Sequence, residues 1–415
     1  MVIQAYVPYK ESAIRYHWLP ATALFILSPL LSMPIVLYGV YRQKVSGYVL
    51  FALFFGLLAW LQVPLGDLYR HTMDTTYYIG KTFGDVISEV KRFPDFISAL
   101  GKWFLVNNNL TYQWYRLFWV TESFLALALP LRWMLLNSKK VYTYKEAFTR
   151  FCIFFLFFEF IMNTSGVRYC CACYNYVLGI HLLLNRKQFI PSIIILLMAT
   201  KIHNSLTFLI PLSFVIYFLT RKRNLGIIVA VFMMIIISLM LTEFGQEMLG
   251  RKAEFYFEGG KSIGGGALKS TPIGFILHIG MRVFLLPFAY LSYKYFSIKD
   301  KWVRILFSWV LIMIIFITNE AMIFRISVLI GSVGVLSLID IESKYNLKKR
   351  FITIVVWCGV MTTICNTLTY HSVILNSHYE RIITPVPMIL DYTYELSWIH
   401  RNIIDNQMIN SRRYF

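Results

Sequence analysis

Long apolar blocks alternate with short polar stretches along most of the chain. A helix needs about 20 mostly apolar residues to cross a bilayer, because each backbone polar group must be paired within the segment. The pattern therefore predicts an all-α, polytopic integral membrane protein with about twelve transmembrane helices. The predicted spans are 19–41, 46–65, 113–136, 147–163, 169–184, 188–201, 204–220, 225–242, 273–293, 303–318, 326–340 and 351–368.

Two connecting segments, 66–112 and 243–272, are much longer than the others. The first contains apolar positions that share one helical face, so we expect a helix at the membrane interface there. The second is rich in glycine, and a loop of that length is typical of a lid or a binding loop. We interpret 1–370 as a single transmembrane domain and 371–415 as a polar, extracytoplasmic tail.

Charge orients this arrangement. The chain is 58% hydrophobic and 15% charged, with a net charge of +19, which in a soluble protein would suggest nucleic-acid binding. Here the basic residues gather in alternate loops, at 42–44, 139–145, 186–187, 221–223, 294–304 and 344–350. The positive-inside rule assigns these loops to the cytoplasm and both termini to the opposite side. We therefore expect no nucleic-acid partner.

The turns opposite the basic loops carry isolated polar residues. Asp67 and Arg70 follow the second span and are spaced to pair on one helical face, as an interfacial ion pair or as part of a site. Arg168 is alone in its turn, where binding to lipid headgroups is the alternative to a functional role. His203 can transfer a proton near neutral pH, although a structural role is the simpler interpretation.

Other ionisable residues stand in the spans or in a third outer turn. Glu320 and Arg325 belong to that turn, and Arg282 lies inside an apolar block. Glu122 and Glu159 lie in the outer halves of the third and fourth spans. A charge inside the bilayer is costly, so such residues indicate function. Each glutamate is a candidate general base or the charge partner of an arginine.

The predicted topology places six of these residues on the same face of the membrane: Asp67, Arg70, Arg168, His203, Glu320 and Arg325. Arginine suits bidentate recognition of phosphate, so the cluster predicts a site for a lipid-linked diphosphate. Among the six cysteines the one CxxC spacing, Cys170 to Cys173, lies inside a predicted span, and His203 has no second ligand at metal spacing. We expect neither a metal nor another cofactor.

Two short motifs resemble a known family. Gly166-Val167-Arg168-Tyr169 precedes a span pair that ends in a turn with Ala199, His203 and Ser205. This arrangement resembles the EpsG-like branch of Wzy-type polysaccharide polymerases, which pairs a G-x-R-type turn with an A-x-x-x-H-x-S-type turn.

Two further elements extend the likeness, which in layout covers most of residues 20–370. Asp67, Tyr69 and Arg70 resemble the early element of that branch, with His71 where a tyrosine is common. Arg325 resembles its late arginine.

The resemblance implies a glycosyltransferase of the bacterial inner membrane, active on its extracytoplasmic face, that extends O-antigen, capsule or exopolysaccharide chains. Donor and acceptor would be undecaprenyl-diphosphate-linked glycans, with a flippase and a chain-length regulator as further partners. We assign diphosphate binding to Arg70, Arg168, Arg282 and Arg325. Asp67 or His203 would orient or deprotonate the acceptor hydroxyl, and a single displacement predicts inversion at the anomeric carbon.

Three other classes of protein are compatible with the same residues. A flippase for lipid-linked oligosaccharide would also need an arginine-lined cavity, but no inverted repeat is visible. An O-antigen ligase or a membrane acyltransferase would use a related site. A scaffold without enzymatic activity would leave the costly buried charges without a task.

Overall fold

The computed structural model describes residues 17–64, 75–90, 96–165, 167–203, 205–220, 224–229, 231, 280, 282–297, 299–316, 320–345 and 347–394. Within these ranges the ordered elements are helices, and none is a strand. The prediction of an all-α protein is therefore confirmed.

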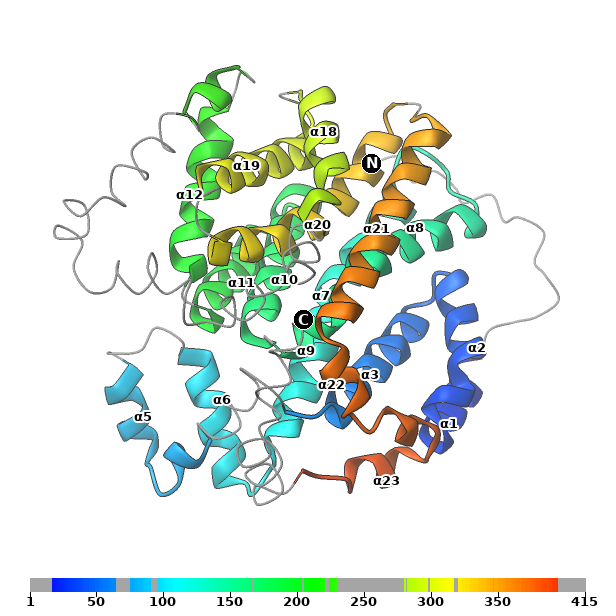
Figure 1. Ribbon diagram of the computed structural model, residues 1–415, viewed down its shortest axis with the longest axis vertical. Helices are drawn as coiled ribbons and strands as arrows, with labels where there is room; N and C mark the ends of the chain where they lie inside the picture. The colour runs from blue at the N-terminus through cyan, green and yellow to red at the C-terminus, as the bar shows by residue number, and fades with distance from the viewer. Residues whose placement is uncertain are drawn as a thin grey trace.

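In the described ranges, helices follow one another along the chain (Figure 1). The first group is α1 (Trp18–Leu27), α2 (Pro29–Tyr41), α3 (Val45–Leu61), η1 (Thr76–Tyr78), α5 (Phe83–Val90), α6 (Phe96–Asn107) and α7 (Tyr112–Asn137). The second group is α8 (Tyr144–Phe157), α9 (Phe160–Ser165), α10 (Val167–His181), η2 (Leu182–Arg186), α11 (Phe189–Ile202) and α12 (Ser205–Leu219). The last group is α18 (Leu286–Lys294), α19 (Lys301–Ile315), α20 (Glu320–Glu342), α21 (Lys349–Thr369), α22 (His371–Leu375), η4 (Tyr379–Ile383) and α23 (Val386–Leu390).

Most predicted spans coincide with one helix, but three of them are divided within the described residues: the first, the fourth and 273–293, which is interrupted by a turn at Phe284 and Leu285. The first breaks at Ser28, whose hydroxyl accepts the N–H of Leu31 and caps α2, while Pro29 opens that helix. The fourth breaks at Glu159, which lies between α8 and α9. The predicted span 225–242 lies almost wholly outside the described residues.

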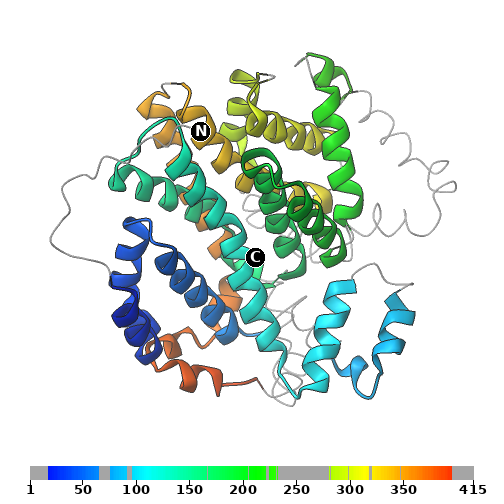
Figure 2. The ribbon, with the colours of Figure 1, turned by 180° about the vertical axis from the view of Figure 1, so that it is seen from behind.

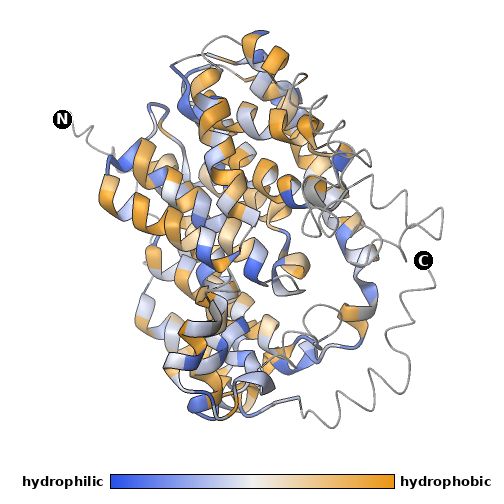
Figure 3. Ribbon diagram, turned by 90° about the vertical axis from the view of Figure 1, so that its left-hand side faces the viewer, coloured by the Kyte–Doolittle hydropathy of each residue, from blue (hydrophilic) through white to orange (hydrophobic). Residues whose placement is uncertain are grey.

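Two helices, α7 and α21, are each long and apolar enough to cross a membrane alone, and α1, α2, α3, α11 and α12 are shorter apolar helices. The number of spans therefore stays a prediction. Hydrophobic residues make up much of most helices in the body of the molecule (Figure 3). On α11 the exposed residues include Phe189, Ile190, Ile193, Ile194 and Leu197. Apolar surface of this extent marks contact with a membrane.

Helix α7 crosses the middle of the molecule, with α3 on one side and α10 and α11 on the other (Figure 2). Its contact with α3 is close because Gly56 has no side chain: a Cβ there would lie 2.2 Å from Thr121 Oγ1. The centre of this layer is aromatic, and the rings of Phe51, Phe55 and Phe124 stack or meet edge to face. This packing fixes α3, α7 and α10 relative to one another, and the site described below is built on α10.

Three loops predicted to be cytoplasmic lie together at one end of the helices. Glu342, at the end of α20, is buried and accepts hydrogen bonds from Arg150 Nε at 2.8 Å and from Lys140 Nζ at 2.8 Å. Lys344 pairs with Asp300 at 2.7 Å and so joins the loop before α19 to the end of α20. The basic loops thus share one end of the bundle.

The opposite end carries α5, α6, α22 and α23 (Figure 1). The predicted interfacial helix corresponds to α6, and its buried residues are Ser98, Ala99, Lys102 and Leu105. Phe104, on the predicted apolar face, is 54% exposed. Ile97 of the same predicted face packs against the hydrophobic core and Trp103 packs against Phe83, so the position of α6 at the membrane interface stays a prediction.

The described part of the predicted tail, 371–394, packs against the end of α3. Trp60 donates its indole N–H to the carbonyl of Tyr392 at 2.7 Å, and Tyr394 donates its hydroxyl to the carbonyl of Leu61 at 2.8 Å. The N–H of Val63 bonds to Ser377 Oγ at 3.0 Å. These bonds fix the end of α3 just before residue 65.

Candidate active site

Three turns that lie far apart in the sequence meet around Tyr169, in the first turn of α10. Its hydroxyl donates a hydrogen bond to the backbone carbonyl of Arg325. The guanidinium carbon of Arg325 lies 5.7 Å from the centre of the tyrosine ring. The imidazole of His203 packs against the same ring edge to face, with centroids 5.1 Å apart. The structure therefore brings His203 and Arg325 together on Tyr169, and Arg168 is its neighbour in the first turn of α10; we call these four residues the Tyr169 cluster.

Burial differs within the Tyr169 cluster. Tyr169 is 6% exposed and lies in the core, whereas Arg168, His203 and Arg325 are half-buried. Tyr169 is therefore held in the core, whereas the side chains of Arg168, His203 and Arg325 are partly accessible. Arg168 stands in the first turn of α10 and Arg325 in the second turn of α20, not in the connecting turns where the sequence analysis placed them.

The backbone around His203 explains the spacing of the second motif. His203 ends α11 in an extended conformation, and its N–H donates to the carbonyl of Ala199 at 3.2 Å. Ser205 begins α12, and its N–H donates to His203 Nδ1 at 3.2 Å. The Ser205 hydroxyl lies 2.8 Å from the same nitrogen. Ser205 therefore holds the histidine ring, whereas Ala199 contributes only a backbone carbonyl.

The bond from Ser205 also assigns the tautomer of His203. A backbone N–H can only donate, so Nδ1 must accept. A neutral imidazole that accepts at Nδ1 carries its proton on Nε2. His203 is therefore a hydrogen-bond donor through Nε2, which differs from the base role that the sequence suggested for it.

Glu159 belongs to the surroundings of the Tyr169 cluster. It occupies the break between α8 and α9, is half-buried, and interacts electrostatically with Cys170, Cys173 and Tyr174. Cys173 in turn lies within hydrogen-bonding reach of Tyr169 and within the electrostatic reach of Arg325. Cys173 therefore interacts both with the carboxyl group of Glu159 and with the Tyr169 cluster.

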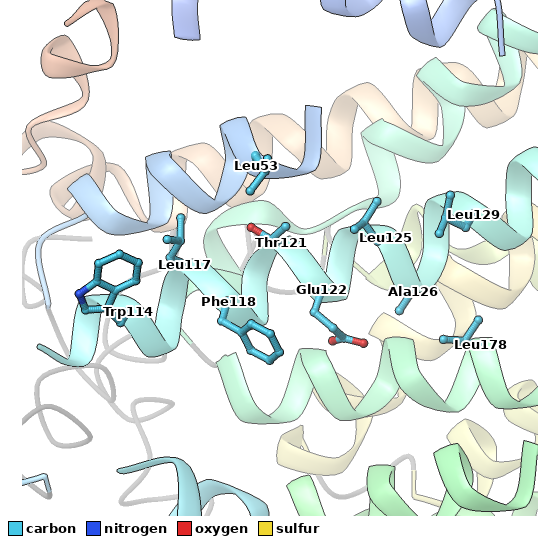
Figure 4. Close-up of a pocket in the computed structure, with 10 residues that line it drawn as sticks. All are labelled: Leu53, Trp114, Leu117, Phe118, Thr121, Glu122, Leu125, Ala126, Leu129 and Leu178. Atoms are coloured by element: carbon cyan, nitrogen blue, oxygen red, sulfur yellow. The ribbon is translucent and has the colours of Figure 1, made fainter. Parts of the chain in front are cut away.

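Glu122 lies on another side of α10. Its Oε2 accepts hydrogen bonds from Cys171 Sγ at 3.2 Å and from Asn175 Nδ2 at 3.1 Å. In Figure 4 the carboxyl group points from α7 toward α10, beside an apolar groove. The structure therefore separates Glu122 from the residues that contact Tyr169.

The remaining predicted residues are not joined to the Tyr169 cluster by the described contacts. Asp67 and Arg70 lie outside the described residues, as does the side chain of Glu320, although its backbone begins α20. Arg282 is half-buried just before α18, in a block that the turn at Leu285 interrupts. Within the described ranges, no three His, Cys, Asp or Glu residues are grouped as metal ligands.

The sequence analysis did not single out Tyr169 and Arg116, two polar residues whose hydrogen bonds join separate parts of the structure. Tyr169 was noted only as part of a motif, and its position beside a lone arginine was the available signal. Arg116, inside a predicted span, is 1% exposed and donates to the carbonyl of Gln62 at 2.8 Å and to that of Trp60 at 3.3 Å. An ionisable residue in a span was again the signal.

An all-helical chain with apolar outer faces and half-buried arginine and histidine at one end of its helices has the build of an integral membrane protein with a polar site. The family model that matches it is that of the EpsG family, over residues 103–383. The chain belongs to the EpsG family, which confirms the resemblance read from the motifs and makes it a membrane protein of polysaccharide biosynthesis.

The matched range runs from α6 to η4 and includes Arg168, His203 and Arg325, whereas Asp67 and Arg70 precede it. No curated protein and no solved structure matches the chain.

Proposed function

We propose that this protein is a membrane glycosyltransferase that polymerises undecaprenyl-diphosphate-linked oligosaccharide repeat units during surface polysaccharide biosynthesis. The observation that carries the proposal is the contact of His203 and Arg325 with Tyr169, the residue that follows Arg168 at the start of α10. Membership of the EpsG family supports the pathway.

The proposed reaction is one displacement. The acceptor hydroxyl oxygen forms a bond to the anomeric carbon of the donor glycan, and the bond from that carbon to the diphosphate oxygen breaks. Its electron pair stays on the diphosphate, and the hydroxyl proton passes to a carboxylate. Negative charge grows on the leaving group, so groups that stabilise it in the transition state accelerate the reaction.

Arg168 and Arg325 suit the leaving group. Each guanidinium can form two parallel hydrogen bonds with phosphate oxygens, and each is held in a half-buried place where its attraction is screened less than in bulk water. Arg282 and Arg70 remain proposed contributors on the basis of the sequence. In this mechanism the arginines supply the positive charge that neutralises the departing diphosphate.

His203 is proposed to donate its Nε2–H to an oxygen of the diphosphate. The role follows from the bond that the Ser205 N–H donates to Nδ1, which makes Nε2 the donor nitrogen of the neutral ring. The proton acceptor must then be a carboxylate. Asp67 is the candidate from the sequence, and Glu159 is a described carboxylate that interacts electrostatically with Cys173, the neighbour of Tyr169.

The two ends of α20 support an extracytoplasmic site. Arg325 lies near its start in the Tyr169 cluster, and Glu342 lies at its end among the basic loops. The positive-inside rule places the basic end in the cytoplasm and thereby the cluster on the outer face of the inner membrane.

Replacing Arg168 or His203 with Ala in the native host, and separating the surface glycan on a gel, tests the proposal. Loss of polymerisation predicts a product with a single repeat unit, while Lys139→Ala, on an exposed basic loop, leaves the ladder unchanged. A normal ladder at normal protein level would contradict the proposal. Long chains that stay on the carrier would indicate a ligase, and repeat units retained in the cytoplasmic leaflet a flippase.

A further inference from the structure

A groove of about 480 Å³ runs along α7, between α3 and α10 (Figure 4). Its lining is apolar apart from two polar residues, Thr121 and Glu122. Trp114 and Leu129, its ends, are fifteen residues apart on α7, which corresponds to a length of about 22 Å. The groove therefore extends over much of the roughly 30 Å of a bilayer's hydrocarbon core.

The wall formed by α10 connects this groove to Arg168. Arg168, Cys171, Asn175 and Leu178 follow one another at spacings of three and four residues and so share one helical face. Cys171 and Asn175 bind Glu122, and Leu178 lines the groove. That face is consequently turned toward α7, and Arg168 stands on it about one turn outward of Cys171.

The groove opens sideways. Phe118 is 61% exposed and Trp114 is 37% exposed, and both stand at the end where α10 begins. Surface of this kind on a membrane protein faces lipid, and tryptophan is typical of the level where hydrocarbon meets headgroups. A chain can therefore enter from the bilayer without crossing the polar end of the protein.

Glu122 marks a defined depth in the groove. Both of its described donors reach Oε2, and within the described residues no donor reaches Oε1. An ionised carboxylate at this position repels a phosphate group. An uncharged hydrocarbon chain meets no such barrier.

We propose that this groove binds the hydrocarbon chain of the substrate's lipid anchor, with the diphosphate at Arg168 and Glu122 preventing it from moving deeper. The inference rests on the proposed function, because the diphosphate that Arg168 binds belongs to that substrate. It adds where the hydrocarbon chain of the substrate lies and which residues line its groove. It also names Glu122 as the group that limits how deep the diphosphate can move.

Photo-crosslinking tests the groove without turnover. The full-length protein in phospholipid nanodiscs is irradiated with a polyprenyl diphosphate that carries a benzophenone at the far end of its chain. We expect labelled peptides from 114–129, and loss of label with excess unlabelled polyprenyl diphosphate but not with excess phospholipid. Label elsewhere, or equal competition by phospholipid, would overturn the inference, and the latter would make the groove a site for bulk lipid.

Variants with a larger side chain in the groove test the same inference by enzyme kinetics. Ala126→Phe places a ring in the groove, Leu125→Phe is a second variant if the first is poorly produced, and Leu197→Phe, on the exposed face of α11, is the matched control. With a long-chain substrate the groove variants should raise KM at least about tenfold, equivalent to about 1.4 kcal/mol of lost binding. With a substrate of two isoprene units their KM should match that of the wild type.

The outcomes separate the two claims. Equal KM values for wild type and groove variants with the long-chain substrate would overturn the groove while leaving the polymerase intact. Absence of polymer from the wild type with either substrate would overturn the proposed function instead, and the crosslink would then show whether the groove still binds a polyprenyl chain.

Discussion

Tyr169 and His203 pack edge to face with their ring centroids 5.1 Å apart, although one residue begins α10 and the other ends α11. The two helices run side by side and are joined at their other ends by η2, so the contact closes the open end of the pair. Arg325 reaches the same tyrosine from α20. This relationship brings two short motifs and a distant arginine into one site.

The hydroxyl of Tyr169 can be removed without removing its ring. Tyr169→Phe leaves the carbonyl of Arg325 without this hydrogen bond, and we expect a loss of about 1 kcal/mol in stability. The polymerisation rate should fall more than the lost stability explains, because the hydrogen bond that holds Arg325 against Tyr169 is removed. Glycan length and thermal melting of the purified protein measure the two effects. Unchanged chain length would show that this bond does not position the arginine.

Three substitutions at His203 separate a donor from a structural residue. His203→Gln keeps an N–H donor near the Nε2 position, and His203→Asn keeps a group that can accept from Ser205 but withdraws that donor. We expect polymerisation rates close to wild type for Gln, and a loss of about 100-fold for Asn and for Ala. Equal loss for Gln and Ala would refute the donor role, and activity in Asn alone would point to a structural one.

The ion pair between Arg150 and Glu342 should matter for stability and not for chemistry. Both side chains are buried, so Glu342→Ala leaves an uncompensated charge and should cost about 3–5 kcal/mol. The double substitution Arg150→Met with Glu342→Met should recover most of the loss. Thermal melting and the protein level in membranes measure both variants. A double variant no more stable than the single one would show that the pair is itself required.

Arg116 should act through the end of α3. Arg116→Met removes two hydrogen bonds from a charged donor to the carbonyls of Gln62 and Trp60, at a cost of about 2 kcal/mol. The end of α3 precedes residues 65–74, so we expect faster proteolysis there and slower polymerisation. Limited proteolysis followed by mass spectrometry identifies the cleavage sites. Cleavage spread evenly over the protein would argue against a local role.

The apolar pattern was enough to predict the class of fold and most helix positions. Blocks such as 113–136 and 351–368 match α7 and α21 within a few residues, because burial in lipid makes hydrophobicity follow helix limits closely. The interruptions at Ser28 and Glu159 were not predicted, since capping and packing decide them locally while hydropathy stays high. The packing of Tyr392 on Trp60 joins residues 332 positions apart, which no local pattern contains.

Part of the site was also within reach of the sequence. Arg168, His203 and Arg325 stood out because ionisable residues are rare in apolar surroundings, and topology placed them on one face. Tyr169 did not stand out, because tyrosine is common throughout this chain and only its contacts set it apart. The tautomer of His203 depends on the direction of one backbone N–H, which follows from the turn geometry and not from residue types.

Polymerisation by purified protein in phospholipid vesicles, supplied only with a diphosphate-linked repeat unit, is the most direct test of the account. We predict glycans of many repeat units from the wild type and from Lys139→Ala, and none beyond the single unit from Arg168→Ala or Arg325→Ala at equal protein level. Chains of wild-type length from both arginine variants, or no chain from the wild-type protein, would contradict it.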